Sequence, residues 1–258
     1  MKDKIIISAA YAVALFAAPI AIHAQITIFA DNFEAGNLDQ WVGHFGGSHF
    51  GMIVSDPLNP ANNVLSFTDV DFGGDMFGDV PGPVNPAVQH LTISFDFLAS
   101  PVPVPPLDNG GFVGINPDTS NPGPFWLAGT IASELIPGGT LLTTDGQWHH
   151  YDIDFTAVAA AHNLTSFFVV LEDFRSYGNS IPGDVFFDNV QVTARLDPSV
   201  IAGLVPCAGP TTGGKWKNHG AYVSEMAKAT DALVAANLIS EEEQDAYVSA
   251  AAQSDCGK

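Results

Sequence analysis

Apolar residues between positions 25 and 194 occur in short runs separated by glycine, proline, asparagine and aspartate. Several of these runs alternate between apolar and polar residues, for example 91–97 (LTISFDF) and 150–155 (HYDIDF). A period of two is typical of antiparallel strands that bury one face. Many short strands with regular turn residues, and no long helical pattern, predict an all-β sandwich over residues 25–196 with one substantial core.

The pattern changes after residue 196. Residues 197–214 are rich in proline and glycine, which indicates a linker. Apolar residues at helical spacing follow at Tyr222, Met226, Ala229, Leu233 and Val234. The sequence Ser-Glu-Glu-Glu at 240–243 is a capping box that opens a second helix. We therefore expect a small α-helical hairpin over residues 215–258.

The first 24 residues have the pattern of an export signal. Two lysines precede an apolar run over residues 5–22, and Ala24 stands at the expected cleavage point. A transmembrane helix is the alternative, but Pro19 and His23 interrupt the apolar stretch. We expect a prokaryotic protein that is secreted or held at the cell surface, begins near residue 25, and has no membrane insertion once the signal is removed.

The chain is strongly acidic, with a formal net charge of −20 at pH 7. Between residues 25 and 196 the only basic side chains are Arg175 and Arg195, whereas 19 side chains are acidic. Such a surface repels phosphate groups and anionic lipids, so nucleic acid and membrane surfaces are not expected partners. Cations are the natural counterpart of this charge, although solubility alone also accounts for it.

The chain has two cysteines, Cys207 and Cys256, which flank the expected helices. In an exported protein such a pair predicts one disulfide, because the compartment is oxidising. Their spacing excludes the usual zinc patterns. We therefore expect a disulfide-closed helical tail.

Two phrases mark the ends of the β-rich region: DNFEAG at 31–36, which leads to Trp41, and FFDNV at 186–190. They resemble the first and last strands of the galactose-binding-like jelly roll used by many carbohydrate-binding modules. The resemblance implies a jelly-roll β-sandwich that holds a structural Ca²⁺. The matching ligands are Glu34, Asp188 and, more weakly, Asp31. The alternative is that these are ordinary strand-end carboxylates.

The same resemblance implies carbohydrate-binding residues. Modules of this kind stack sugar rings on aromatic side chains and bind hydroxyl groups through carboxylates, amides and arginine. The matching candidates are Trp126, Tyr177, Arg175 and Asp173. Trp126 follows a loop rich in proline and glycine, where ligand contacts tend to lie. The alternative for an aromatic residue of a β-sandwich is a place in the core.

Two further resemblances concern bacterial secreted proteins. Residues 125–130 (FWLAGT), 171–174 (LEDF) and 183–189 (GDVFFDN) resemble jelly-roll domains of surface proteins, many of which carry a Pro-Glu-Pro sorting tail that is not found in this sequence. The segment that begins KWKNHGAYVS at 215–224 resembles a C-terminal segment of secreted prokaryotic proteins of unknown role. That resemblance implies attachment or stability and no known chemistry.

No catalytic group of residues stands out. His149 and His150 would face opposite sides of a strand, and the Gly-x-Ser-x-Gly nucleophile motif does not occur. The sequence favours a secreted, non-catalytic module that recognises extracellular carbohydrate or matrix. One alternative is a structural surface or biofilm protein without a small ligand. Another is a polysaccharide-active enzyme with two carboxylates facing each other across a groove.

Overall fold

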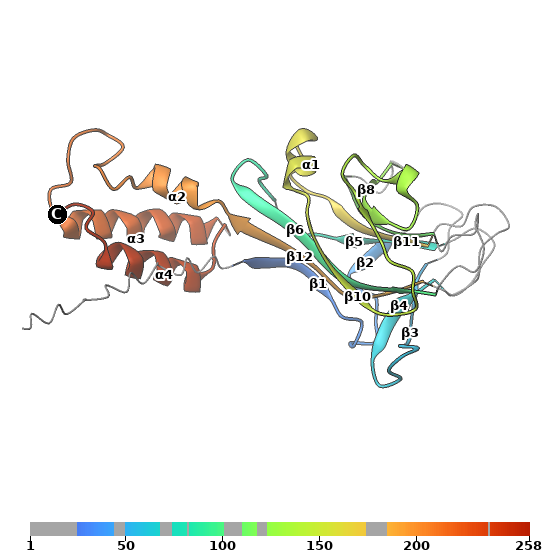
Figure 1. The fold of residues 1–258 in the computed structure, drawn as a ribbon. Coiled ribbons are helices and arrows are strands. Elements are labelled where there is room, and N and C mark those ends of the chain that lie inside the picture. Colours follow the sequence, from blue (N-terminus) through green and yellow to red (C-terminus); the bar gives the residue numbers. More distant parts are fainter. Residues whose placement is uncertain are drawn as a thin grey trace, which may run out of the picture.

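Two β-sheets packed face to face, with a helical unit at one end, make up this chain (Figure 1). The structure is a computed structural model. It describes residues 25–43, 50–67, 74–81, 83–100, 110–117, 123–173, 185–236 and 238–258. The expected export signal therefore lies outside the described residues.

The first sheet, sheet A, has the strand order β10-β6-β12-β4-β3. Its long strand β12 pairs with β6 on one side, while β4 and β1 share the other side, and all these pairs are antiparallel. The strands are β1 (Ile26–Asp31), β3 (Met52–Ser55), β4 (Asn63–Ser66), β6 (Gln89–Ala99), β10 (His149–Asp154) and β12 (Val185–Leu196).

The second sheet, sheet B, has the order β2-β5-β11-β7-β8-β9, in which only the short β8–β9 pair is parallel. Its strands are β2 (Trp41–Gly43), β5 (Gly74–Asp79), β7 (Gly111–Asn116), β8 (Phe125–Gly129), β9 (Thr140–Leu141) and β11 (Phe168–Asp173). Two short helices, η1 (Ala132–Glu134) and α1 (Thr156–Ala161), lie in the connections.

Side chains of both sheets meet in one buried core. Alternate residues of β6, such as Phe95 and Phe97, belong to the same buried cluster as Val169 and Leu171 of β11. The rings of Phe97 and Phe187 lie 5.5 Å apart within it. The alternation seen in the sequence therefore matches the alternating burial of β6 and β10, whereas β5 and β7 are buried on both sides. The β-sandwich that this pattern predicts is confirmed.

The helical unit follows β12 and has a separate buried cluster. It contains α2 (Pro198–Leu204), α3 (His219–Ala235) and α4 (Glu241–Gln253), so the segment expected as a linker includes one short helix. The expected capping box is present, because the side chain of Ser240 accepts from Glu243 N and the Glu243 side chain accepts from Ser240 N. Among the described residues, none of the helices is both long enough and apolar enough to cross a membrane.

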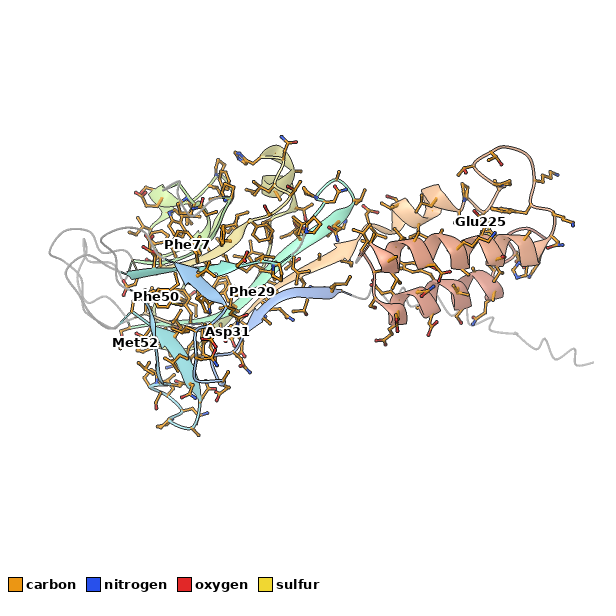
Figure 2. The ribbon with its side chains drawn as sticks, turned by 180° about the vertical axis from the view of Figure 1, so that it is seen from behind. Phe29, Asp31, Phe50, Met52, Phe77 and Glu225 are labelled. Carbon is orange, nitrogen blue, oxygen red and sulfur yellow. A yellow bond between two sulfur atoms is a disulfide. The ribbon has the colours of Figure 1, made fainter. Side chains whose placement is uncertain are left out.

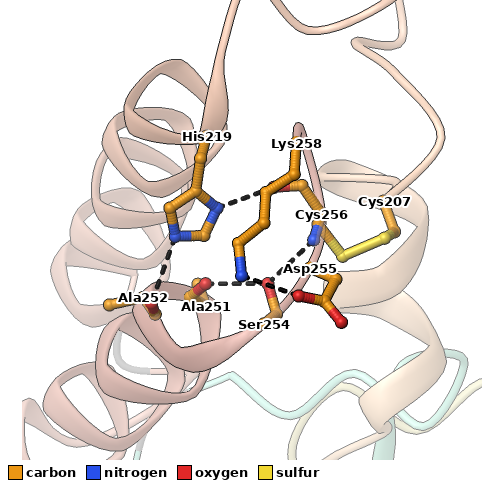
Figure 3. Close-up of polar contacts among 8 residues, drawn as sticks. All are labelled: Cys207, His219, Ala251, Ala252, Ser254, Asp255, Cys256 and Lys258. Carbon is orange, nitrogen blue, oxygen red and sulfur yellow. Dashed lines mark hydrogen bonds and ion pairs between the residues drawn. A yellow bond between two sulfur atoms is a disulfide. The ribbon is translucent and has the colours of Figure 1, made fainter.

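The predicted disulfide between Cys207 and Cys256 is confirmed (Figure 3). It ties the segment after α2 to the residues that follow α4. His219, the first residue of α3, holds the same end of α4, since its ring nitrogens lie 2.7 Å from the carbonyl oxygen of Cys256 and 3.1 Å from that of Ala252. The helices are therefore joined covalently and by hydrogen bonds at this end.

Candidate functional site

The side of sheet B that faces away from the core carries the first candidate site, which we call the outer face. In β11 the core residues Val169 and Leu171 alternate with Phe168, Val170 and Glu172. Glu172 therefore lies on the outer face. In the strand register it is directly opposite Asp75 of β5 and Phe112 of β7.

Trp126 of β8 lies on the same outer face. It is directly opposite Gly114, which is two residues along β7 from Phe112. The rings of Phe112 and Trp126 have their centroids 5.2 Å apart. A Cβ atom on Gly114 would lie 2.7 Å from Cε3 of Trp126, so the missing side chain makes room for the indole. Trp126 is half-buried.

The carboxyl group of Glu172 is in an unfavourable position for a negative charge. Burial raises its pKa to about 8, and the charges of Asp75 and Asp173 add to the increase. Within the described part of the chain, no hydrogen bond or ion pair to this carboxyl group is found. At neutral pH Glu172 is therefore mostly protonated.

The four predicted carbohydrate-binding residues are not all on this face. Trp126 is on it, whereas Tyr177 and Arg175 lie outside the described residues. Asp173 is fully buried at the end of β11 and is opposite Gly111 of β7. A Cβ atom added to Gly111 would contact the ring of Phe97 in the core. Asp173 therefore faces the space between the sheets, on the other side of sheet B from Trp126.

The sequence analysis assigned no site role to Glu172 or to Asp75. The sequence does contain one indication for Glu172, because this residue directly follows the apolar run Phe-Val-Val-Leu at 168–171. A charged residue at that point is unusual in a strand that is otherwise mostly buried. No comparable signal pointed to Asp75. It becomes a neighbour of Glu172 only through the pairing of β5 with β11.

The three carboxylates expected to bind calcium fall into two separate groups. Asp31 is buried and serves the core: Oδ1 accepts from Phe33 N at 2.8 Å, and Oδ2 accepts from Nε1 of Trp41 at 2.7 Å. Figure 2 shows Asp31 on β1 beside the core residue Phe29. Both of its carboxylate oxygens are therefore engaged in the core, and its expected role as a weaker calcium ligand stays a prediction.

Glu34 and Asp188 meet at the start of β4. Glu34 accepts a hydrogen bond from Asn63 N at 2.9 Å, and Asp188 accepts one from Nδ2 of Asn62 at 2.9 Å. Burial raises the pKa of Asp188, hydrogen bonds from Asn62 and Asn189 oppose the increase, and nearby Asp96 and Glu34 add to it. This corner therefore carries excess negative charge.

The fit of this corner to Ca²⁺ is partial. Glu34 and Asp188 supply two carboxylates, which are hard oxygen ligands of the kind calcium prefers. Among the described residues, no group of three or more His, Cys, Asp and Glu is arranged to hold a metal ion. A calcium ion here would therefore need amide or carbonyl oxygens for most of its six to eight ligands.

No protein-family model matches the chain, and no curated protein matches it in sequence. Solved structures that it resembles include carbohydrate-binding modules. A family 11 module from Clostridium thermocellum, in complex with a β-1,3-1,4-mixed-linked tetrasaccharide, is 16% identical and covers 65% of this chain and 94% of its own, with a TM-score of 0.37. The module TmCBM27, studied for specific mannan recognition, is 13% identical over 67% of this chain and 99% of its own, with a TM-score of 0.34.

An arabinose-bound α-L-arabinofuranosidase is 16% identical over 69% of this chain but only 28% of its own, with a TM-score of 0.34. TM-scores and identities of this size assign neither a detailed topology nor a ligand. Function must therefore be argued from the residues of this chain.

Proposed function

We propose that this protein is a secreted, non-catalytic module that binds a neutral extracellular polysaccharide or matrix glycan on the outer face of sheet B. The observation that carries the proposal is the half-buried Trp126, whose ring packs against Phe112 and opposite Gly114 on the same side of the sheet as Glu172. An indole stacks on the apolar face of a sugar ring with little loss of side-chain entropy, and carboxyl groups bind hydroxyls.

The acidity of the chain favours an uncharged ligand. With a formal net charge of −20, the protein repels anionic polymers and leaves neutral glycans unaffected. Tyr177 and Arg175 follow β11 in sequence and remain part of the proposed site. Asp173 is buried and would act by holding the end of β11, without contact to the sugar. The same proposal includes export directed by residues 1–24 and a jelly-roll type of β-sandwich. Both of these parts are supported by the sequence alone.

The alternative function is that of a polysaccharide-active enzyme. One observation favours it: the carboxyl residues Glu172 and Asp75 are directly opposite each other in neighbouring strands. Retaining glycosidases hold their two carboxyl groups about 5 Å apart, which a cross-strand pair can approach. However, Asp75 is only 3% exposed and is out of reach of a substrate. Binding without cleavage is therefore the better-supported function.

The test is affinity electrophoresis against β-glucans, xylans and mannans, with Trp126→Ala compared with the wild type. We expect wild-type affinities on the order of micromolar to millimolar, and loss of retardation in the variant at an unchanged melting temperature. Phe50→Ala, which removes a partly exposed ring near β3 in sheet A, is the matched control (Figure 2). If no glycan retards the wild type, the structural-protein alternative replaces this proposal.

We also propose a structural Ca²⁺ held by Glu34 and Asp188. Support comes from the two end phrases of the β-rich region and from the excess negative charge where these residues meet. Such an ion would neutralise that charge and tie the chain after β1 to β12. It would have no part in sugar chemistry.

A further inference from the structure

A small cavity lies on the side of sheet A that faces away from the core. Its volume is about 190 Å³, below the roughly 300–1,000 Å³ of pockets that hold drug-sized ligands. Its lining residues, all of them polar, are Gln25, His90, Thr92, Asp154 and Arg195. We call it the Arg195 cavity. Its size suits one small polar molecule or one unit of a polar chain.

Three adjacent strands of sheet A build the wall of this cavity. Leu91 of β6 is a core residue, so His90 and Thr92 on either side of it lie on the opposite side of the sheet. In the strand register Arg195 of β12 is directly opposite His90, and Asp154 of β10 is directly opposite Thr92. Because β10, β6 and β12 are consecutive in the sheet, these four residues form one continuous surface.

Contacts outside the cavity hold two of these side chains in position. Oδ1 of Asp154 accepts a hydrogen bond from Thr156 N at 2.8 Å. Nε2 of His90 lies 3.4 Å from Oδ2 of Asp197, the N-cap of α2, where β12 leads into the helical unit (Figure 1). Asp154 is exposed, and 39% of the His90 side chain is exposed. The cavity is therefore open to solvent and has a preformed wall.

The lining offers hydrogen-bond donors and acceptors within one small space. The guanidinium group of Arg195 can only donate, the carboxylate of Asp154 can only accept, and the hydroxyl group of Thr92 does both. These two opposite charges balance each other, which favours an uncharged ligand. The lining residues in the described part of the chain include no Trp, Tyr or Phe, so hydrogen bonds and not ring stacking would hold the ligand. Neighbouring hydroxyl groups of a sugar, each of which donates and accepts, match this arrangement.

Resting on the proposed glycan binding, we propose that the Arg195 cavity is a second carbohydrate site, which takes a single uncharged sugar residue at the end of a glycan chain. Arg195 donates to one hydroxyl group of that sugar, and Asp154 accepts from another. Trp126 is on the outer face of sheet B, so the two sites lie on opposite sides of the sandwich. A protein with both sites can link two separate glycan chains.

The experiment is an NMR titration of the protein with the methyl glycosides of glucose, mannose, galactose and xylose, which imitate a chain end. At least one should bind with a dissociation constant on the order of millimolar. Arg195→Met removes the guanidinium group and keeps the length of the side chain. Asp154→Asn removes the charge and keeps an acceptor for Thr156 N. Each should weaken binding about tenfold or more, because hydrogen bonds to charged groups are the strong ones.

Two control variants should keep the wild-type affinity for the glycoside. Asp152→Asn changes an exposed carboxylate on the same side of β10 that does not line the cavity. Trp126→Ala changes the site on the other sheet. Melting curves identify any variant that does not fold, and Thr92→Val, which removes only a hydroxyl group, then takes its place.

Unchanged affinity in both Arg195→Met and Asp154→Asn would overturn the inference. Loss of glycoside binding in Trp126→Ala would also overturn it, because the sugar would then lie on the outer face of sheet B. Tighter binding of glucuronic acid than of the methyl glucoside would show that the cavity selects a negative charge, against the inference. If the wild type binds polysaccharide but none of the four glycosides, only the inference fails. If it binds neither, the proposed function fails with it.

Discussion

At the scale of single residues, environment separates carboxyl groups that look alike in the sequence. Asp31 accepts two hydrogen bonds in the core, whereas Asp188 and Glu172 are buried near other negative charges. The first type stabilises the fold. The other two store unfavourable electrostatic energy that a cation or a ligand could relieve.

Replacing Glu172 by Gln should stabilise the protein in alkaline solution. Between its ordinary value of 4.5 and about 8, the folded state keeps a proton that the unfolded state has released. The free energy of unfolding therefore falls as the pH rises through this window, by an amount on the order of a few kcal/mol. Urea unfolding at pH 5, 7 and 9 should show a stabilising effect of Glu172→Gln that grows with pH. Glu134→Gln, at an exposed site, should show no such trend.

Calcium should raise the melting temperature and a chelator should lower it, because an ion that binds only the folded state stabilises that state. Asp188→Ala should remove the difference between the two conditions. Asp31→Ala serves as the contrast, because it removes the acceptor of the Trp41 indole and should lower the melting temperature equally with and without calcium. A wild-type melting curve unaffected by chelator would reject the calcium proposal.

At the scale of elements, the outer face of sheet B depends on glycines that leave room for rings. Gly114→Ala would place a Cβ atom 2.7 Å from Cε3 of Trp126 and also 2.7 Å from the carbonyl oxygen of Phe125. We expect a loss of about 1–3 kcal/mol in the free energy of unfolding, together with a changed tryptophan emission spectrum and weaker glycan binding.

A second glycine provides the control for this substitution. Gly203 lies in α2 and has open space around its missing side chain. Gly203→Ala should therefore leave emission and binding unchanged and should stabilise the helix by up to about 1 kcal/mol. Similar effects of the two substitutions would show that the Trp126 ring is not held in place by Gly114.

At the scale of the whole molecule, two separately packed units share the chain. The core between the sheets and the cluster around Tyr222 and Met226 have no buried residue in common, and Leu196 at the end of β12 belongs to the second cluster. The disulfide lies entirely in the helical unit and closes a sequence separation of 49 residues.

Non-reducing mass spectrometry should therefore find one linked peptide pair that contains Cys207 and Cys256. Reduction, or the double substitution by serine, should destabilise the helical unit by about 4 kcal/mol in the chain-entropy model. The loss should appear in the helical circular dichroism signal, while the sandwich should keep its melting transition and any glycan binding. Simultaneous melting of both parts would show that they form one cooperative unit.

Local patterns in the sequence were sufficient for the elements themselves. The alternation in β6 predicts a strand with one buried side, the Ser240 and Glu243 pair predicts the start of α4, and two cysteines predict the bridge. Each of these depends on residues that are near in sequence or, for the cysteines, on chemistry that allows one pairing. The helix α2 was missed because proline and glycine dominate the composition around it.

Contacts between distant strands were decided only by the tertiary structure. Asp75 and Glu172 are 97 positions apart in sequence, yet the antiparallel register of β5 and β11 makes them direct neighbours. The same register places Asp173 between the sheets and Glu172 outside them, a distinction that one residue of slippage would reverse. The sequence alone thus indicated the strand-rich region and the two longer helices of the tail, because period and capping are local. Strand pairing decided which carboxyl group shares a side of sheet B with Trp126 and which one faces the core, because burial and charge depend on neighbours that the fold brings together.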